Sequence, residues 1–352
     1  MSRTPSQAAV ETRWYDADSR FIAAHHQPAL LIELAQDRGA RSHKLLRHTG
    51  LFLDDLYRGQ ACISPAQSLR LIDNARQMER GQELGFLWGS RLFPGHYGAI
   101  STLLQQAGSL ADMLAVIRRY QPLLFPWLVP QVVEDERWCY LVWLDPIGTG
   151  ALRPFLTETA MSAVASVSAW LAGRKLPWRY LFHGKAPAHR AQYDVYFGEH
   201  LRFSAAVDVM LIERQWLHQR WRPGSEMITT VARGEADTLL AELGAGRGFL
   251  EVVYRHLYQN LSRPLSLEQV AGHFGMSPAT FKRKLKHHQC SFQRLLDDAR
   301  LHASLYLFHI KAWSNEQVAD YLNCNDPTNF RRAFKRWTGS TPSDYRGQIL
   351  TP

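Results

Sequence analysis

The chain has 352 residues and a net charge of +9, and 46% of its residues are hydrophobic. This is enough apolar material for one large and one small folded core, so a wholly disordered protein is excluded. No apolar stretch approaches the roughly 18 residues of a membrane span, and residues 1–18 lack the apolar segment of a secretory signal. The four cysteines lie far apart, which favours a reducing cytoplasm and predicts neither a zinc cluster nor a disulfide framework.

The positive charge is concentrated near the C-terminus. Residues 251–352 carry 14 Lys and Arg against 8 Asp and Glu, a net charge of +6, whereas the preceding 250 residues carry +3. Such a basic module next to a nearly neutral body indicates an anionic polymer as partner, nucleic acid above all. A basic surface that only keeps the protein in solution is the alternative.

Helical and strand patterns alternate over the first 220 residues or so. We expect residues 1–27 to be a flexible N-terminus, because they are polar. Amphipathic patterns and capping signals predict helices over residues 28–37, 66–80, 109–120, 155–171 and 188–197. Runs of β-branched and aromatic residues predict a hairpin of 131–134 with 138–144, a strand over 178–182, and one or two strands within 201–212.

These elements predict an α+β domain over residues 28–233, followed by a linker over 234–249. The linker contains a possible short helix from Gly234 to Leu243 and a glycine-rich stretch from Gly244 to Gly248. Its Gly-x-Gly does not follow a strand and lacks a correctly placed third glycine, so a dinucleotide-binding loop is not predicted.

The tail contains an internal repeat. Ser266–Lys286 and Ser314–Lys335 both begin with Ser-x-Glu-Gln-Val-Ala, pass through a short turn, and continue with a Pro and a basic helix. In the first copy the apolar positions 267, 270, 271 and 274 form one stripe, Gly275 suits a tight turn, and Ser277 caps the next helix. Each copy is therefore a helix-turn-helix unit, and the C-terminal domain, residues 250–348, is predicted to be all-α.

The second helix of each unit has an anchored face and a free face. Phe281 and Leu285 hold it in the first unit, and Phe330 and Phe334 hold it in the second, where Asn323 replaces the turn glycine. The residues left to face outward are Ala279, Thr280, Lys282, Arg283 and Lys286 in the first unit, and Thr328, Asn329, Arg331, Arg332, Lys335 and Arg336 in the second.

These outward residue types match the reading of a DNA major groove. Arg pairs with two acceptors on guanine and Asn pairs with adenine, although any one Lys or Arg can contact a phosphate instead. Residues 292–308 between the units form one predicted helix of roughly 26 Å, which could hold two reading helices about one DNA turn, roughly 34 Å, apart. The alternative for a single unit is an ordinary helical hairpin in a bundle, but the tandem pair with a helical spacer favours DNA.

Residues 250–348 resemble the AraC/XylS family of bacterial transcription regulators. The second unit carries the most specific likeness, from Asn325-Asp-Pro-Thr-Asn-Phe to Asp344-Tyr-Arg346. Three departures stand out: Asn323-Cys324 replaces Gly-Phe, the stretch before the spacer helix lacks its usual Gly and Pro, and Lys284 occupies a position that is usually apolar. The resemblance implies sequence-specific promoter binding, most often with activation through RNA polymerase, and a homodimer.

The body is similar to the arabinose-binding-like regulatory domain of ornithine- and arginine-responsive relatives in that family. Leu84-Gly-Phe-Leu-Trp-Gly89, Phe93-Pro-Gly-His-Tyr-Gly-Ala99 and Ser109-Leu-Ala-Asp-Met-Leu114 carry this likeness, which covers roughly residues 28–215. It implies a small-molecule effector, whose identity stays open.

An effector pocket needs apolar walls and a few polar anchors. The candidates for these are Trp127, Trp143, Arg153 and Tyr193, with His183 as a further one; Arg153 could meet a carboxylate. No metal or other cofactor is predicted, because the His25-His26 and His287-His288 pairs lack ligand spacing, and no activated nucleophile is recognisable.

The sequence thus predicts a cytoplasmic, effector-controlled DNA-binding regulator and no enzyme. Its expected partners are double-stranded promoter DNA, a small molecule and RNA polymerase. An enzyme fused to a DNA-binding tail, for example one of alkyl-transfer repair, and an architectural protein that binds any DNA sequence are the two alternatives.

Overall fold

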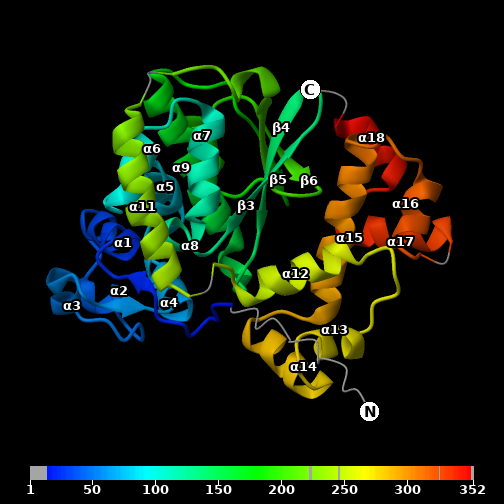
Figure 1. Cartoon of the computed structure of the whole chain (residues 1–352), viewed down its shortest axis with the longest axis horizontal. Coiled ribbons are helices and arrows are strands. Elements are labelled where there is room, and N and C mark those ends of the chain that lie inside the picture. The colour runs from blue at the N-terminus through cyan, green and yellow to red at the C-terminus, as the bar shows by residue number, and fades with distance from the viewer. Residues whose placement is uncertain (1–13, 222–223, 245, 325, 350–352) are drawn as a thin grey trace, which may run out of the picture.

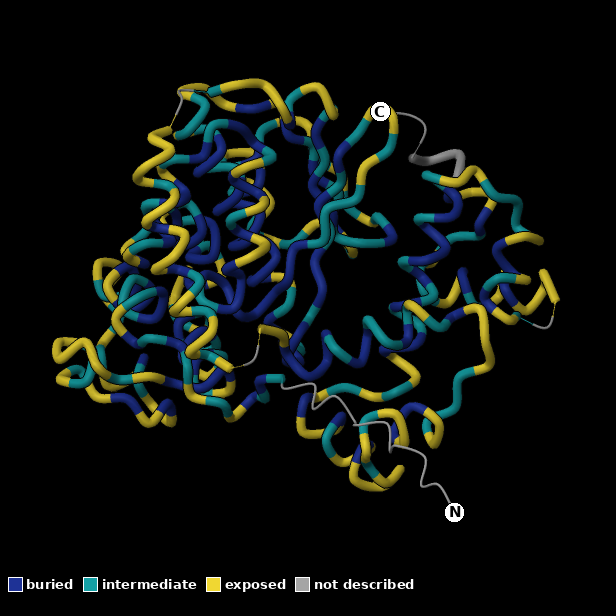
Figure 2. Tube along the Cα trace, in the orientation of Figure 1, coloured by how far each residue is buried: buried dark blue, intermediate teal, exposed yellow. Residues whose placement is uncertain are grey.

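The computed structural model describes residues 14–221, 224–244, 246–324 and 326–349. Figure 1 shows a group of helices on one side of a central sheet and a second group of helices beyond its other side. Each group surrounds its own cluster of buried apolar side chains. The buried residues of both groups are dark blue along the trace in Figure 2. The α+β class of the first part and the helical class of the second are those predicted from the sequence.

Among the residues that the structure describes, the first part contains most of the helices and all of the strands. In chain order its elements are β1 (Ile22–Ala23), α1 (Gln27–Gln36), α2 (Ser42–Leu45), α3 (Leu53–Arg58), β2 (Cys62–Ile63), α4 (Pro65–Arg76), η1 (Gly81–Glu83), α5 (Leu84–Leu92), α6 (Ala99–Gln105), α7 (Leu110–Arg119), α8 (Gln121–Leu124), β3 (Val129–Glu134), β4 (Trp138–Leu144), η2 (Gly150–Leu152), α9 (Arg153–Ala172), β5 (Arg179–His183), α10 (Arg190–Phe197), β6 (Leu201–Ala205), β7 (Val209–Glu213), η3 (Arg214–Trp216) and α11 (Glu226–Glu242).

The second part is entirely helical. Its elements are α12 (Phe249–Gln259), α13 (Leu267–His273), α14 (Pro278–His287), α15 (Phe292–His309), α16 (Asn315–Tyr321), α17 (Pro327–Thr338) and α18 (Pro342–Ile349). Its core also takes in Val129, Leu144 and Ala206 from the first part, so the two parts share packing.

The central sheet has the strand order β3-β4-β7-β5-β6, in which only β5 and β6 run parallel. On β4 the side chains alternate. Cys139, Leu141 and Trp143 are buried in the first core, whereas Trp138 and Tyr140 point to the opposite face, which borders a cleft. One face of the sheet is thus covered by the first helices, and the other looks toward the C-terminal helices.

The N-terminal segment is partly fixed, which corrects the prediction of a flexible stretch over residues 1–27. Residues 1–13 lie outside the described part of the chain. Tyr15 is buried, forms a parallel bridge with Gly248, and its backbone N–H donates to the carbonyl of Arg247 at 2.9 Å. The polar character of residues 1–27 gave no sign of this pairing, because Gly248 lies more than 200 residues further along the chain.

The structure of residues 234–249 also differs from the predicted linker. Residues 234–242 continue α11, which begins after the N-cap Ser225 and buries Ala232 and Ala236 in the first core. Gly234 lies inside this helix and does not begin a linker. The connection to α12 is therefore the short stretch after Leu243, of which Ala245 lies outside the described residues.

Close packing of α5 on α9 holds the first core together. A Cβ atom at Gly89 would lie 2.2 Å from the carbonyl oxygen of Thr159 and 2.8 Å from Cβ of Ser162. Both contacts are far inside van der Waals distance, so only glycine lets the two helix backbones approach this closely.

Gly89→Ala should therefore destabilise the protein by about 1–3 kcal/mol, the usual range for overpacking. Gly234→Ala is the matched control, because the same added methyl group meets open space on the helical surface and should stabilise by about 0.5–1 kcal/mol. Urea denaturation followed by circular dichroism measures both. Equal stability of the two variants would contradict the close contact.

Candidate nucleic-acid interface

The first helix-turn-helix unit consists of α13 and α14. Ser266 caps α13 in a capping box with Gln269, and Ser277 accepts a hydrogen bond from the N–H of Thr280 to cap α14. Gly275 has a φ of +66° at the turn between them. The local signals read from the sequence therefore correspond to the elements observed.

Two buried side chains orient α14. Phe281 and Leu285 lie four residues apart and are 0% and 1% exposed, so the opposite face of the helix must point away from the core. The residues of that face are all exposed: Ala279, Thr280, Lys282, Arg283 and Lys286.

The second unit, α16 and α17, repeats this design. Ser314 forms a capping box with Gln317, and the carboxylate of Asp326 caps α17 by accepting from the N–H of Asn329. Asn323 takes the left-handed turn position with a φ of +51°, and its side-chain amide donates to the carbonyl of Leu261 at 3.0 Å. This hydrogen bond gives the asparagine a contact that the usual glycine could not make.

The outward face of α17 is cationic. Phe330 and Phe334 are both fully buried, and the residues opposite them are exposed: Thr328, Asn329, Arg331, Arg332, Lys335 and Arg336. Arg336 forms an exposed ion pair with Asp297 at 3.3 Å, and the amide of Asn329 also donates to Asp326 at 3.1 Å.

The other cations on the two faces are free of such pairs. Among the described residues, no carboxylate forms an ion pair with the following side chains: Lys282, Arg283, Lys286, Arg331, Arg332 and Lys335. Exposed, unpaired cations on two similar helices form a surface that attracts a polyanion.

One continuous helix, α15, joins the two units. Its 18 residues correspond to a rod of roughly 27 Å. Leu295, Leu296 and Ala299 are buried along the first half of this rod, and Leu307 and Phe308 near its end. Helices α14 and α17 therefore belong to the same core.

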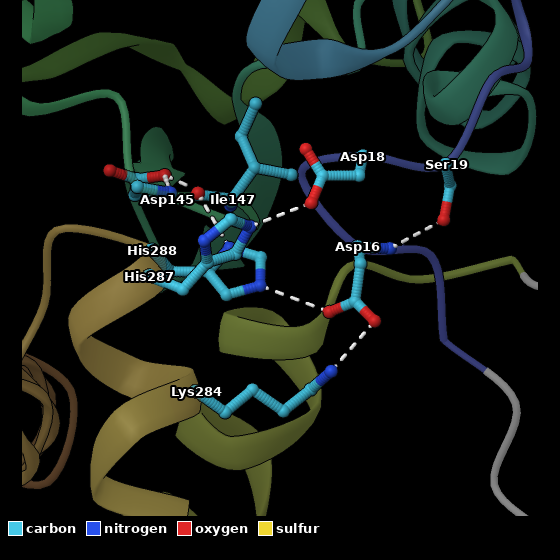
Figure 3. Close-up of polar contacts among 9 residues, drawn as sticks. Asp16, Asp18, Ser19, Asp145, Ile147, Lys284, His287 and His288 are labelled. Carbon is cyan, nitrogen blue, oxygen red and sulfur yellow. Dashed lines mark hydrogen bonds and ion pairs between the residues drawn. The ribbon is translucent and has the colours of Figure 1, made fainter.

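A set of polar contacts attaches the first unit to the first part of the chain (Figure 3). Lys284 Nζ lies 2.7 Å from Asp16 Oδ2, and the ring of His288 contacts Asp16 Oδ1 at 3.0 Å and the carbonyl oxygen of Ile147 at 2.8 Å. The neighbouring His287 contacts Asp18 at 2.9 Å. Lys284, which departs from the apolar residue usual at its position, thus points away from the free face and binds the N-terminal segment.

Sequence reasoning did not predict this attachment. The only available signal was the lysine at an apolar position, and nothing near it in the sequence indicates Asp16 as its partner.

A cleft of about 1170 Å³ separates the open face of the sheet from α15 and α18. Val142, Val209 and Leu211 form part of the sheet wall, and His302 and Tyr306 belong to the opposite wall on α15. Burial lowers the pKa of His302 to about 4, so this wall carries a neutral imidazole, whose Nδ1 contacts the hydroxyl of Tyr254.

The four effector candidates from the sequence do not line this cleft. Trp127 and Trp143 are buried in the first core, and Arg153 donates to the carbonyl of Trp143 at 2.8 Å. Tyr193 is also buried, and its hydroxyl donates to the carboxylate of Glu158, which also contacts His189. His183 is exposed and contacts the carbonyl of Ala205.

No helix among the described residues is long and apolar enough to cross a membrane. Within the same part of the chain, no group of three or more His, Cys, Asp or Glu side chains is arranged to hold a metal ion.

Two family models match the chain. The arabinose-binding domain of AraC transcription regulators, N-terminal, matches residues 39–221, and a helix-turn-helix domain matches residues 270–348.

Relatives with known names among the similar proteins are named as transcription regulators. The chain is 28% identical over 267 residues to the ornithine utilization regulator of Pseudomonas aeruginosa, which covers 75% of this chain and 78% of that protein. It is 23% identical over 332 residues to an HTH-type transcriptional regulator of Mycobacterium bovis, and this alignment covers 90% of this chain and 94% of that protein. The crystal structure of the regulator CdpR from Pseudomonas aeruginosa covers 91% of this chain and 98% of its own, with 20% identity and a TM-score of 0.44.

Proposed function

The chain belongs to the AraC family of transcription regulators, and we propose that α14 and α17 read its promoter from two successive major grooves on one face of the duplex. The observation that carries this proposal is the shared design of the two helices. Each is anchored by two buried side chains four residues apart and exposes a face rich in unpaired cations. The single helix α15 supplies a rigid spacer between them.

We assign different roles to the outward residues. Arg332, in the middle of the exposed face of α17, reads a base edge, and Lys335, one turn further along, contacts a phosphate. The corresponding reader on α14 is Arg283. The remaining outward residues contact the sugar-phosphate backbone of the DNA, which positions the two helices, or they contact bases next to those that Arg332 and Arg283 read.

We place the effector in the cleft between the sheet and α15. Much of the cleft wall is apolar, and the guanidinium groups of Arg137 and Arg179 lie 5.2 Å and 4.9 Å from the ring centre of Trp138. Neither arginine forms an ion pair with a carboxylate among the described residues. An apolar molecule that carries a carboxylate suits this combination.

Such a ligand would touch both parts of the chain, and it can change DNA binding only if it binds one arrangement of the two parts better than the other. Family membership also supports activation by contact with RNA polymerase, a homodimer and a location in the cytoplasm. Because the similar proteins are named as regulators, we propose a regulator and no enzyme. A gel-shift assay with promoter DNA and scrambled competitor tests sequence-specific binding against an architectural role, for which both DNAs should bind equally.

Arg332→Ala should cost roughly 1–3 kcal/mol on the cognate site and relax the preference at one base position. The reason is loss of two hydrogen bonds to one base edge. Selection from a randomised site measures this. An unchanged base preference would contradict the reading role.

Lys335→Ala should weaken binding to all sequences alike and reduce the dependence of binding on salt by about one unit of slope, because one phosphate contact is lost. Titrations at several salt concentrations on cognate and scrambled DNA measure it. Since Lys335 is exposed, stability should stay within about 0.5 kcal/mol. A loss restricted to the cognate sequence would argue against a phosphate contact.

Leu211→Trp should fill the cleft and weaken effector binding at least about tenfold, the effect of roughly 1.4 kcal/mol. A thermal-shift screen of metabolite carboxylic acids on the full chain identifies the ligand to test. Trp127→Phe, at a residue buried in the first core, is the control and should bind normally. If Trp127→Phe weakened binding and Leu211→Trp did not, the ligand would instead lie in the first core, near the candidates predicted from the sequence.

A further inference from the structure

The end of α14 meets two separate pieces of the sensor domain, here residues 14–244. One is the N-terminal segment at Asp16, and the other is the loop between β4 and η2 at Ile147. We call the contacts of Asp16, Ile147, Lys284 and His288 the joint (Figure 3). Its central member is His288, whose side chain is 0% exposed.

Both nitrogens of the His288 ring face a hydrogen-bond acceptor. Nδ1 lies 2.8 Å from the carbonyl oxygen of Ile147, and Nε2 lies 3.0 Å from Asp16 Oδ1. A carbonyl oxygen and an ionised carboxylate can only accept. Both ring nitrogens must therefore donate, and an imidazole with two N–H groups carries a positive charge.

In the hydrogen bond between His288 Nε2 and Asp16 Oδ1, the proton is bonded to the ring nitrogen. Burial by itself would raise the pKa of Asp16, but the hydrogen bonds from His288 and Lys284 outweigh it, and that pKa is lowered. The carboxylate is thus ionised and binds two cationic groups, one on each oxygen. Charge-assisted hydrogen bonds of this kind are about twice as strong as neutral ones.

The loop before η2 packs closely against the backbone of His288. Gly148 has a φ of +87°, and a Cβ atom there would lie 1.8 Å from the carbonyl oxygen of His288. The carboxylate of Asp145 holds this loop by accepting from the backbone N–H groups of residues 147, 148 and 149. On the remaining side, the ring of Phe249 on α12 lies 5.3 Å away.

Other charged groups around the joint have partners of their own. His287 on the same helix contacts Asp18 in an exposed pair, and Asp145 is occupied by its own loop. On α12, Glu251 pairs with Arg255 at 2.8 Å and with Arg247 at 3.7 Å. Asp16 is therefore the carboxylate that binds the His288 ring.

We propose that a doubly protonated His288 joins the sensor domain to the first reading unit, which makes the attachment dependent on pH. The ring can donate to both Ile147 and Asp16 only while it carries both protons, so loss of either proton removes one of the two hydrogen bonds. At the acid end the joint is lost only as falling pH protonates Asp16. Lys282, Arg283 and Lys286 stay exposed while the joint is formed, so the joint sets the orientation of the unit and leaves its reading face open.

Nuclear magnetic resonance of the full chain with ¹⁵N-labelled histidine rings tests the charge state directly. His288→Gln identifies the signals of this residue by their loss. At about pH 6 we expect both ring nitrogens of His288 to be protonated, with slowly exchanging N–H protons because the ring is buried. A single protonated nitrogen at this pH, in a chain whose other signals show it folded, would overturn the proposal.

Hydrogen exchange of residues 14–18 tests the consequence. After correction for intrinsic exchange, their protection in the parent chain should fall about tenfold or more between about pH 6 and 8.5, as expected for loss of a hydrogen bond to a charged group. His288→Gln should show low protection at both values. His43→Gln, at an exposed histidine of α2 that takes no part in the joint, is the control and should keep the parent profile.

Gly148→Ala gives a second route that changes no titratable group. The added methyl group should separate the loop from His288, lower protection of residues 14–18 at both pH values, and speed exchange of the ring N–H protons. If His288→Gln keeps the pH dependence of the parent chain, or Gly148→Ala keeps full protection, the joint does not depend on this histidine.

Discussion

The structure depends on the burial of one pair of side chains in each reading helix. Phe281 with Leu285 and Phe330 with Phe334 enter the same core along α15, so the core determines which face of α14 and α17 is left outside. The exposed cations have few contacts of their own, and their direction follows from these anchors. Because α15 joins the two helices, the exposed faces of α14 and α17 have a fixed spacing. The regular helical repeat of a DNA duplex can match such a spacing.

The second constraint is the packing between the two parts of the chain. Val129, Leu144 and Ala206 belong to the core of the C-terminal helices, and the joint adds charge-assisted hydrogen bonds at the end of α14. Further along, the sheet and α15 separate to form the cleft. The sensor domain thus meets the C-terminal helices by direct contact at one place and faces them across the cleft at another.

Elements determined by local chemistry were predictable from the sequence. The serine caps, the prolines at helix starts and the i, i+4 anchors act over a few residues, and both helix-turn-helix units have the predicted form. Tertiary relationships were not predictable. Trp138 and Trp143 are both aromatic residues of one strand, but their separation of five positions places them on opposite faces, and only the fold shows that Trp138 faces the cleft.

Long-range partners explain the other differences. Asp16 and Lys284 are 268 positions apart, and Tyr15 pairs with Gly248, so the N-terminal segment appeared free when only its polarity was considered. Gly234 suggested a break, but burial of Ala232 and Ala236 outweighs the low helix propensity of a single glycine.

The continuity of α15 has a mechanical consequence. The joint lies before its first turn, and the cleft borders its second half, so a ligand in the cleft would act on the helix at the end far from the joint. A small displacement at the cleft would tilt the rod and swing α17 through a wider arc than α14. The two halves of a bipartite operator would then differ in function: the half bound by α14 would serve as the fixed reference, and the half bound by α17 would register the movement.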